Sequence, residues 1–177
     1  MIIRRLAALS FLMFCATTQA QDQASNLTAN IVSLQSLQVV AALPAAAKDV
    51  TDLKFSEIFK MPVGPRGMEP SMKLSSLNKK PVRIVGYMAK QETPTPGLFI
   101  VTPLPVNMGD EDDKFSDDMP ANSIFVHVDS PDALVQYTPG LINLTGVLSV
   151  GGMTEVDGHV SFVRVKLDAA LSGLSRH

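Results

Sequence analysis

Residues 141–150 read Leu-Ile-Asn-Leu-Thr-Gly-Val-Leu-Ser-Val, and residues 158–168 read Gly-His-Val-Ser-Phe-Val-Arg-Val-Lys-Leu-Asp. Both stretches are rich in β-branched residues, which favour strands. The second largely alternates apolar with polar side chains: Val160, Phe162, Val163, Val165 and Leu167 against Ser161, Arg164 and Lys166. The sequence Val156-Asp157-Gly158 is typical of a tight turn, so this part of the chain predicts a β-hairpin.

Three earlier segments have the same character: residues 82–89, 97–102 and 123–129. They are rich in Val, Ile and Phe and are separated by residues that form turns. Gly86 and Gly146 fall inside predicted strands. A glycine there marks the bulge or sharp bend that closing a barrel requires.

Together these five strands predict a mainly β protein, built as a five-stranded OB-like barrel with short helices. Residues 131–137 fit one of those helices, between the third and fourth strands. A small β-sandwich is the alternative. Five strands are few for an immunoglobulin-like sandwich, and its Cys–Trp–Cys signature is absent from this sequence.

The chain before the barrel is less regular. Residues 21–52 contain no Gly and one Pro, and they fit either a helix over 26–42 or a mobile N-terminal linker. Residues 53–59 and 71–77 each fit a short helical turn. Between them lies a run of turn formers in which Arg66 either presents its guanidinium to an anion or is simply solvated.

The first twenty residues have the three parts of a secretory signal peptide. Arg4 and Arg5 precede an apolar stretch, which is shorter than the roughly 20 residues of a membrane-spanning helix. Small residues end at Ala20, where we expect cleavage. The predicted organisation is a signal peptide (1–20), a helical or flexible leader (21–52), an OB-like barrel domain (53–168) and a C-terminal tail (169–177).

Cleavage after Ala20 makes the protein periplasmic or secreted, with no stable membrane insertion. The alternative is anchoring in the inner membrane by an uncleaved signal. The mature chain would have 157 residues, 13 basic and 17 acidic, and it would lose Cys15, the single cysteine. It would therefore have no disulfide, and its net charge of −4 argues against nucleic-acid binding.

One segment carries the excess negative charge. Residues 110–118 contain six carboxylates and one lysine, whereas the rest of the mature chain has 12 basic and 11 acidic residues. Clustered carboxylates repel one another, so this segment predicts either a solvated loop or a divalent-cation site, with Ca²⁺ favoured by all-oxygen ligands. The candidate metal ligands are Asp110, Asp112, Asp113, Asp117 and Asp118. The spacing does not follow the EF-hand pattern.

Other chemistry has less support from the sequence. His127 falls in the third strand, on the face opposite its apolar neighbours, and no spacing with His159 indicates a zinc site. No nucleophile-elbow, phosphate-loop or zinc-protease motif occurs. Acidic residues next to strands, such as Glu155, are expected at turns or on the surface.

Several segments together resemble an uncharacterised family of exported bacterial proteins. The resemblance lies in Phe55-Ser56-Glu57-Ile58-Phe59-Lys60-Met61-Pro62-Val63-Gly64-Pro65, in Pro81-Val82-Arg83-Ile84-Val85-Gly86-Tyr87-Met88 and in Leu98-Phe99-Ile100-Val101-Thr102-Pro103. It implies a small OB-like barrel of unknown function, in a family some of whose members are encoded near ABC exporter genes. Many members carry a Cys-x-His motif after the second strand, where this chain has its acidic segment instead. A role for that motif therefore does not transfer.

Two functions follow as expectations. The first is a non-catalytic periplasmic binding or accessory protein, with an envelope protein as partner and a link to an envelope transport system, as the resemblance implies. The alternative is a small metal-dependent hydrolase that uses residues 110–118.

Overall fold

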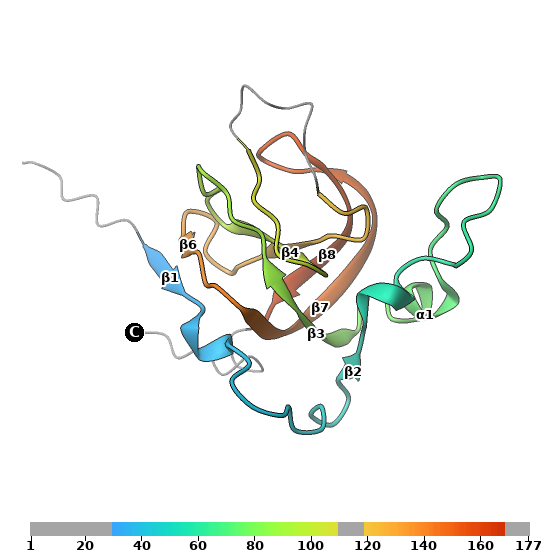
Figure 1. Cartoon of the computed structure of the whole chain (residues 1–177), viewed down its shortest axis with the longest axis horizontal. Helices are drawn as coiled ribbons and strands as arrows, with labels where there is room; N and C mark the ends of the chain where they lie inside the picture. The colour runs from blue at the N-terminus through green and yellow to red at the C-terminus, as the bar shows by residue number, and fades with distance from the viewer. Residues whose placement is uncertain (1–29, 110–118, 169–177) are drawn as a thin grey trace, which may run out of the picture.

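The structure is a computed structural model that describes residues 30–109 and 119–168 (Figure 1). Most of its regular structure is strand, and the mainly β fold expected from the sequence is confirmed. In chain order the elements are β1 (Ile31–Ser33), η1 (Gln35–Leu37), β2 (Thr51–Asp52), η2 (Phe55–Glu57), α1 (Met72–Ser76), β3 (Pro81–Met88), β4 (Leu98–Thr102), β5 (Ile124–His127), β6 (Leu134–Gln136), β7 (Leu141–Thr154) and β8 (Val160–Leu167).

Five of these strands form a closed barrel. Their order is β3-β4-β5-β8-β7, and β3 also pairs with β7, which closes the ring. All neighbours are antiparallel except β5 and β8, which run parallel with Phe125 opposite Arg164. Figure 1 shows the long, curved β7 and β8 forming one wall of the barrel. This is the five-stranded barrel that the sequence predicts.

Barrel closure depends on two glycines inside long strands. A Cβ atom on Gly86 would lie 2.7 Å from the Phe55 ring and 2.8 Å from the backbone oxygen of Thr102. A Cβ atom on Gly146 would collide with the backbone oxygen of Lys166. Neither distance is compatible with a side chain, so both glycines allow neighbouring strands to approach closely at bends of the sheet.

Apolar side chains from every barrel strand fill the interior. The main core includes Val82, Ile84, Phe99, Val101, Ile124, Val126, Ile142, Leu144, Leu148, Val163, Val165 and Leu167. Leu34 and Leu37 from the N-terminal segment, together with Ile58 and Leu74, belong to the same cluster. The segment before β3 is therefore packed onto the barrel rather than separate from it.

The expected N-terminal helix over 26–42 is wrong for the residues that are described. Residues 31–33 form β1, which pairs in parallel with β6, and a single 3-10 turn follows. Leu34 and Leu37 are buried in the core, and β1 pairs with β6 beside them. These contacts stabilise the segment more than a short helix would, because isolated helices of this length are marginal. The short helix expected over 131–137 is also wrong, because residues 134–136 form β6 as the partner of β1.

The two helical turns before the barrel are confirmed. Residues 55–57 form η2, and residues 72–76 form α1. Ser71 caps α1 by accepting a hydrogen bond from the backbone N–H of Leu74 at 2.9 Å. In α1 this cap coincides with a buried apolar residue, Leu74.

Candidate functional site

The acidic residues proposed as cation ligands, Asp110, Asp112, Asp113, Asp117 and Asp118, lie outside the described residues. The residues flanking them are described. Met108 and Met119 pack against a second apolar cluster formed by Ala89, Leu98, Ile100 and Phe125. The described residues on either side of the acidic segment therefore pack against β4 and β5. Within residues 30–109 and 119–168, no group of three or more His, Asp or Glu side chains could hold a metal ion.

A polar cluster lies at the end of the β7–β8 hairpin, where its carboxylate is unexpectedly buried. Glu155 is 5% exposed and accepts a hydrogen bond from the hydroxyl of Ser161, which is fully buried. Arg164 donates to the Ser161 hydroxyl at 2.9 Å and to the backbone oxygen of Gly151 at 2.6 Å. The Ser161 hydroxyl thus bridges the Arg164 guanidinium and the Glu155 carboxylate, and the Gly151 contact links β8 to the irregular end of β7.

The expected pattern of β8 is wrong at this cluster. Val160 and Phe162, expected inside, are 70% and 37% exposed, whereas Ser161 and Arg164, expected outside, are buried. The pairing of β7 with β8 shifts register between Val150 and Met153. The extra residue of this bulge lies in β7, so it re-aims the β7 side chains beyond Val150. β8 itself alternates, with Ser161, Val163, Val165 and Leu167 buried. The expectation is wrong because Val160 and Phe162 lie on the outer face of this strand.

Two histidines lie at the edge of this cluster. Nε2 of His127, on β5, is 3.2 Å from Oε2 of Glu155, and Nδ1 of His159 is 3.2 Å from Oδ1 of Asp157. The hydroxyl of Thr95, in the β3–β4 connection, donates to Asp157 at 3.5 Å. The cluster therefore joins β5 to the β3–β4 and β7–β8 connections, the region where OB-type barrels bind ligands.

The chemistry available at this cluster is limited by its burial. Ser161 has no exposed surface, and its oxygen contacts both Glu155 and Arg164, so it is not placed as a nucleophile. Its hydrogen bonds instead satisfy a carboxylate and a guanidinium that would be costly to bury alone. The arrangement is a buried polar cluster that stabilises the hairpin. The sequence analysis does not predict this cluster; the available signal is the interruption of the apolar residues of the last strand by Ser161 and Arg164.

A second candidate lies on the opposite side of β8, in residues 59–70, which we call the arm. Lys60 N–H donates to the oxygen of Glu69 at 2.9 Å, and Gly67 N–H donates to the oxygen of Gly64 at 3.0 Å. The two sides of the arm are therefore joined like a hairpin, with the turn at residues 64–67. Figure 1 shows it extending away from the barrel, next to α1.

The base of the arm is fixed to the barrel. Phe59 packs against Phe162 with ring centroids 6.0 Å apart. The hydroxyl of Ser71 donates to the backbone oxygen of Glu57 at 2.5 Å, and Lys73 pairs with the Glu57 carboxylate at 2.6 Å. These contacts explain how a segment rich in Pro and Gly keeps a defined position.

Apolar side chains on and beside the arm face solvent. Met61 is 75% exposed, Met72 is 84% exposed, and Val63 and Met68 are each 50% exposed. Isolated exposed apolar residues are ordinary, whereas contiguous exposed apolar patches are typical of interaction sites. Methionine is common on such surfaces because its flexible thioether adapts to its partner.

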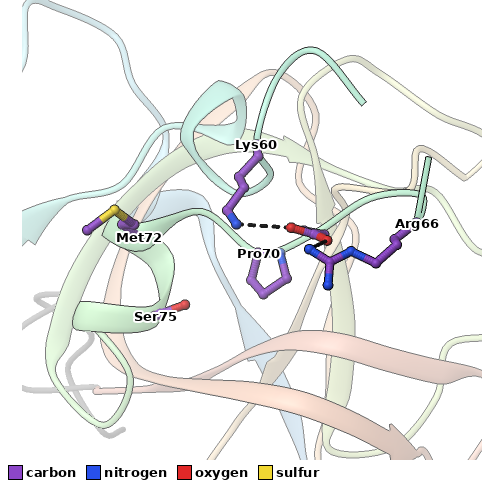
Figure 2. A pocket seen from close by; sticks show the side chains of 6 residues that line it. Lys60, Arg66, Pro70, Met72 and Ser75 are labelled. Carbon is purple, nitrogen blue, oxygen red and sulfur yellow. Dashed lines mark hydrogen bonds and ion pairs between the residues drawn. The ribbon is translucent and has the colours of Figure 1, made fainter. Parts of the chain in front are cut away.

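An open pocket lies between the arm and α1, lined by Lys60, Arg66, Glu69, Pro70, Met72 and Ser75. Figure 2 shows Lys60 and Arg66 extending from two sides toward one carboxylate. That carboxylate is Glu69, which lies 3.0 Å from Nζ of Lys60 and 2.7 Å from a guanidinium nitrogen of Arg66. Arg66 is thus exposed, as expected, and also paired.

Two carboxylates close to the arm have altered acidity. A hydrogen bond from Lys73, aided by one from the backbone N–H of Lys54, lowers the pKa of Glu57 below its usual value. A bidentate hydrogen bond from Arg83 lowers the pKa of Asp52, and the same contact raises the pKa of Arg83. The Asp52–Arg83 pair connects the segment before β3 to β3 itself, whereas the Glu57–Lys73 pair joins η2 to α1 within that segment.

The comparisons with known proteins found little similarity to this chain. No protein-family model matches it, and no curated protein matches it. Among solved structures it is similar to a DUF3299 family protein from Pseudomonas aeruginosa, with 10% identity and a TM-score of 0.44. The match covers 70% of this chain and 93% of that one. A likeness this distant does not extend a function from one chain to the other.

No helix within residues 30–109 and 119–168 is long and apolar enough to cross a membrane.

Proposed function

We propose that this protein is a non-catalytic binding or accessory protein, periplasmic or secreted, that contacts a protein partner of the cell envelope. The observation that carries the proposal is the arm, a projecting element held at its base with four exposed apolar side chains on and beside it. Fully burying an exposed side chain of this size contributes on the order of 1.5–3 kcal/mol, and the half-exposed Val63 and Met68 would contribute about half of that. Covering them with a partner recovers that free energy.

The link to an envelope transport system rests on the resemblance and is part of the same proposal. Export rests on residues 1–20, with an uncleaved, membrane-anchored form as the alternative. The buried polar cluster at Glu155 supports a non-catalytic role for that end of the barrel, because Ser161 is enclosed and hydrogen-bonds to both Glu155 and Arg164.

Site-specific photocrosslinking in living cells tests the proposal. A photoreactive amino acid at Met68, on the arm, is expected to give a discrete crosslinked band with an envelope protein. The matched control is Val147, an apolar residue 40% exposed on β7, which is expected to give none. Absence of a band at Met68, or equal bands at both positions, would overturn a role for the arm.

The acidic segment keeps the alternative, a metal-dependent hydrolase, open to a direct test. If Asp110, Asp112, Asp113, Asp117 and Asp118 bind Ca²⁺, titration of the mature protein should release or absorb heat and raise its melting temperature. Replacing these five residues by Asn should abolish both effects. Absence of heat and of a thermal shift at millimolar Ca²⁺ would exclude the cation site on which the alternative depends.

A further inference from the structure

Charge is distributed very unevenly between the arm region and the rest of the chain. Residues 53–80, which contain the arm and α1, have six basic and two acidic residues. The remainder of the mature chain has seven basic and 15 acidic residues. A local surplus of four positive charges on a chain of net charge −4 steers negatively charged partners toward this surface.

The structure concentrates part of this surplus in the pocket. Glu69 alone pairs with both Lys60 and Arg66, so the three groups together carry one net positive charge. The side chain of Arg66 is 85% exposed and that of Lys60 is 55% exposed. One guanidinium nitrogen of Arg66 lies 2.7 Å from Glu69, and a guanidinium carries five N–H donors, which suit it to bind a second carboxylate.

Apolar groups lie directly beside these charges. Met72 and Pro70 line the same pocket as Lys60 and Arg66, as Figure 2 shows. Met72 is 84% exposed and Met61, next to Lys60 in the sequence, is 75% exposed. A ligand that fits must therefore offer a negative group next to an apolar one.

We infer that the pocket between the arm and α1 binds an acidic protein segment, with a carboxylate on the exposed guanidinium of Arg66 and an adjacent apolar side chain on Met72. The inference rests on the proposed function and names the chemistry of its partner. A carboxylate matches the single net charge of the pocket, whereas a phosphate group carries about −1.5 to −2. Interfaces of this kind combine an apolar anchor with charge pairs that set specificity and association rate.

Titration of the isotope-labelled mature protein with two synthetic peptides tests the inference by NMR. One peptide alternates Glu with Leu, and the other replaces every Glu by Gln. The acidic peptide is expected to shift amide signals of residues 60–75, and the neutral peptide to bind about tenfold more weakly, the cost of losing a charge-assisted contact. Raising the salt concentration should weaken the acidic peptide further, because exposed charges are screened.

Three variants locate the effect. Arg66→Gln and Met72→Ser should each weaken the acidic peptide several-fold, whereas Lys90→Gln, at an exposed lysine in the β3–β4 connection, should not. Equal binding of both peptides, or shifts outside residues 60–75, would overturn the inference. Phosphatidylglycerol vesicles that displace the peptide and bind more tightly would overturn it in favour of a membrane surface.

The crosslinking and peptide experiments fail independently. A band at Met68 with no preference for the acidic peptide would retain a partner on the arm and overturn its acidic character. Without a band at Met68, the proposed function is overturned, whatever the peptides do.

Discussion

The end of the β7–β8 hairpin and the arm both place charged side chains among apolar ones, with opposite outcomes. In the hairpin, Glu155, Ser161 and Arg164 are buried and satisfy one another. In the arm, Lys60 and Arg66 share one carboxylate at the surface, beside exposed methionines. Buried charges need partners within the chain and so stabilise one fold, whereas exposed charges cost little and remain available to another molecule. The hairpin is therefore where substitutions should affect folding, and the arm is where they should affect binding.

The largest effect is expected for Arg164→Ala. It removes the group that contacts Gly151 and Ser161 and leaves buried Glu155 without its cationic neighbour. The free energy of unfolding should fall by about 3 kcal/mol, measured by urea denaturation of the mature protein. Lys166→Ala is the matched control on the same strand; its side chain is 69% exposed, and we expect a change below about 0.5 kcal/mol. Similar losses for both variants would contradict a structural role for the cluster.

Coupling within the hairpin comes next in size. Ser161→Ala alone should destabilise by about 1–2 kcal/mol, because it leaves both Glu155 and Arg164 short of a hydrogen bond. In the double variant with Arg164→Ala, the loss of unfolding free energy should be smaller than the sum of the two single losses by at least about 0.5 kcal/mol. A double-mutant cycle by urea denaturation measures this. Additive losses would show that the serine does not connect the two charged groups.

A smaller effect is expected from acid on the ion pairs near the arm. The pKa values of Asp52 and Glu57 are lowered by hydrogen bonds from Arg83 and Lys73. Each pair therefore contributes fully above the ordinary values of 3.8 and 4.5 and loses its contribution as pH falls through the lower folded values. Both carboxylates are partly exposed, so each pair contributes less than about 1 kcal/mol.

Denaturation at pH 6 and pH 3 measures this contribution. The Asp52→Asn variant should be less stable than the parent chain at pH 6, and the difference should be smaller at pH 3. A difference that is the same at both pH values would exclude the ion pair as its source.

The smallest effect on stability is expected on the arm itself. Met61→Ser and Met68→Ser remove side chains that are at least half exposed, so the free energy of unfolding should change by less than about 0.5 kcal/mol. Thermal and urea denaturation check this. A loss above about 1 kcal/mol would show that the methionines pack within the chain, and the contrast between arm and hairpin would disappear.

Local patterns predicted most of the barrel. Strands 82–89, 97–102 and 123–129 correspond to β3, β4 and β5, and the glycine inside β3 marks a close approach of strands. Period-two alternation and turn residues are local properties, and they are enough to place strands with one buried face. They were not enough for residues 131–137, whose strand forms only because β1 lies beside it.

The candidate sites were less accessible to such reasoning. Arg66 stands out in the sequence because Pro65 and Gly67 flank it. Its pairing with Glu69 and its place in one pocket with Met72 depend on how the arm folds back toward α1. Glu155 was expected at the surface, and the register shift beyond Val150 places it inside. No periodic signal reports a bulge that depends on pairing with another strand.

By itself, the sequence determined a β-rich chain, the glycines that let its strands approach, and the separation of charge between residues 53–80 and 110–118, because composition and short-range periodicity are properties of neighbouring residues. The tertiary structure alone decided which polar residues are buried and which apolar residues remain exposed. Burial is set by partners distant in the chain: Phe162 meets Phe59, and Arg164 reaches Gly151. Those contacts bury the polar cluster of the hairpin and leave the arm exposed.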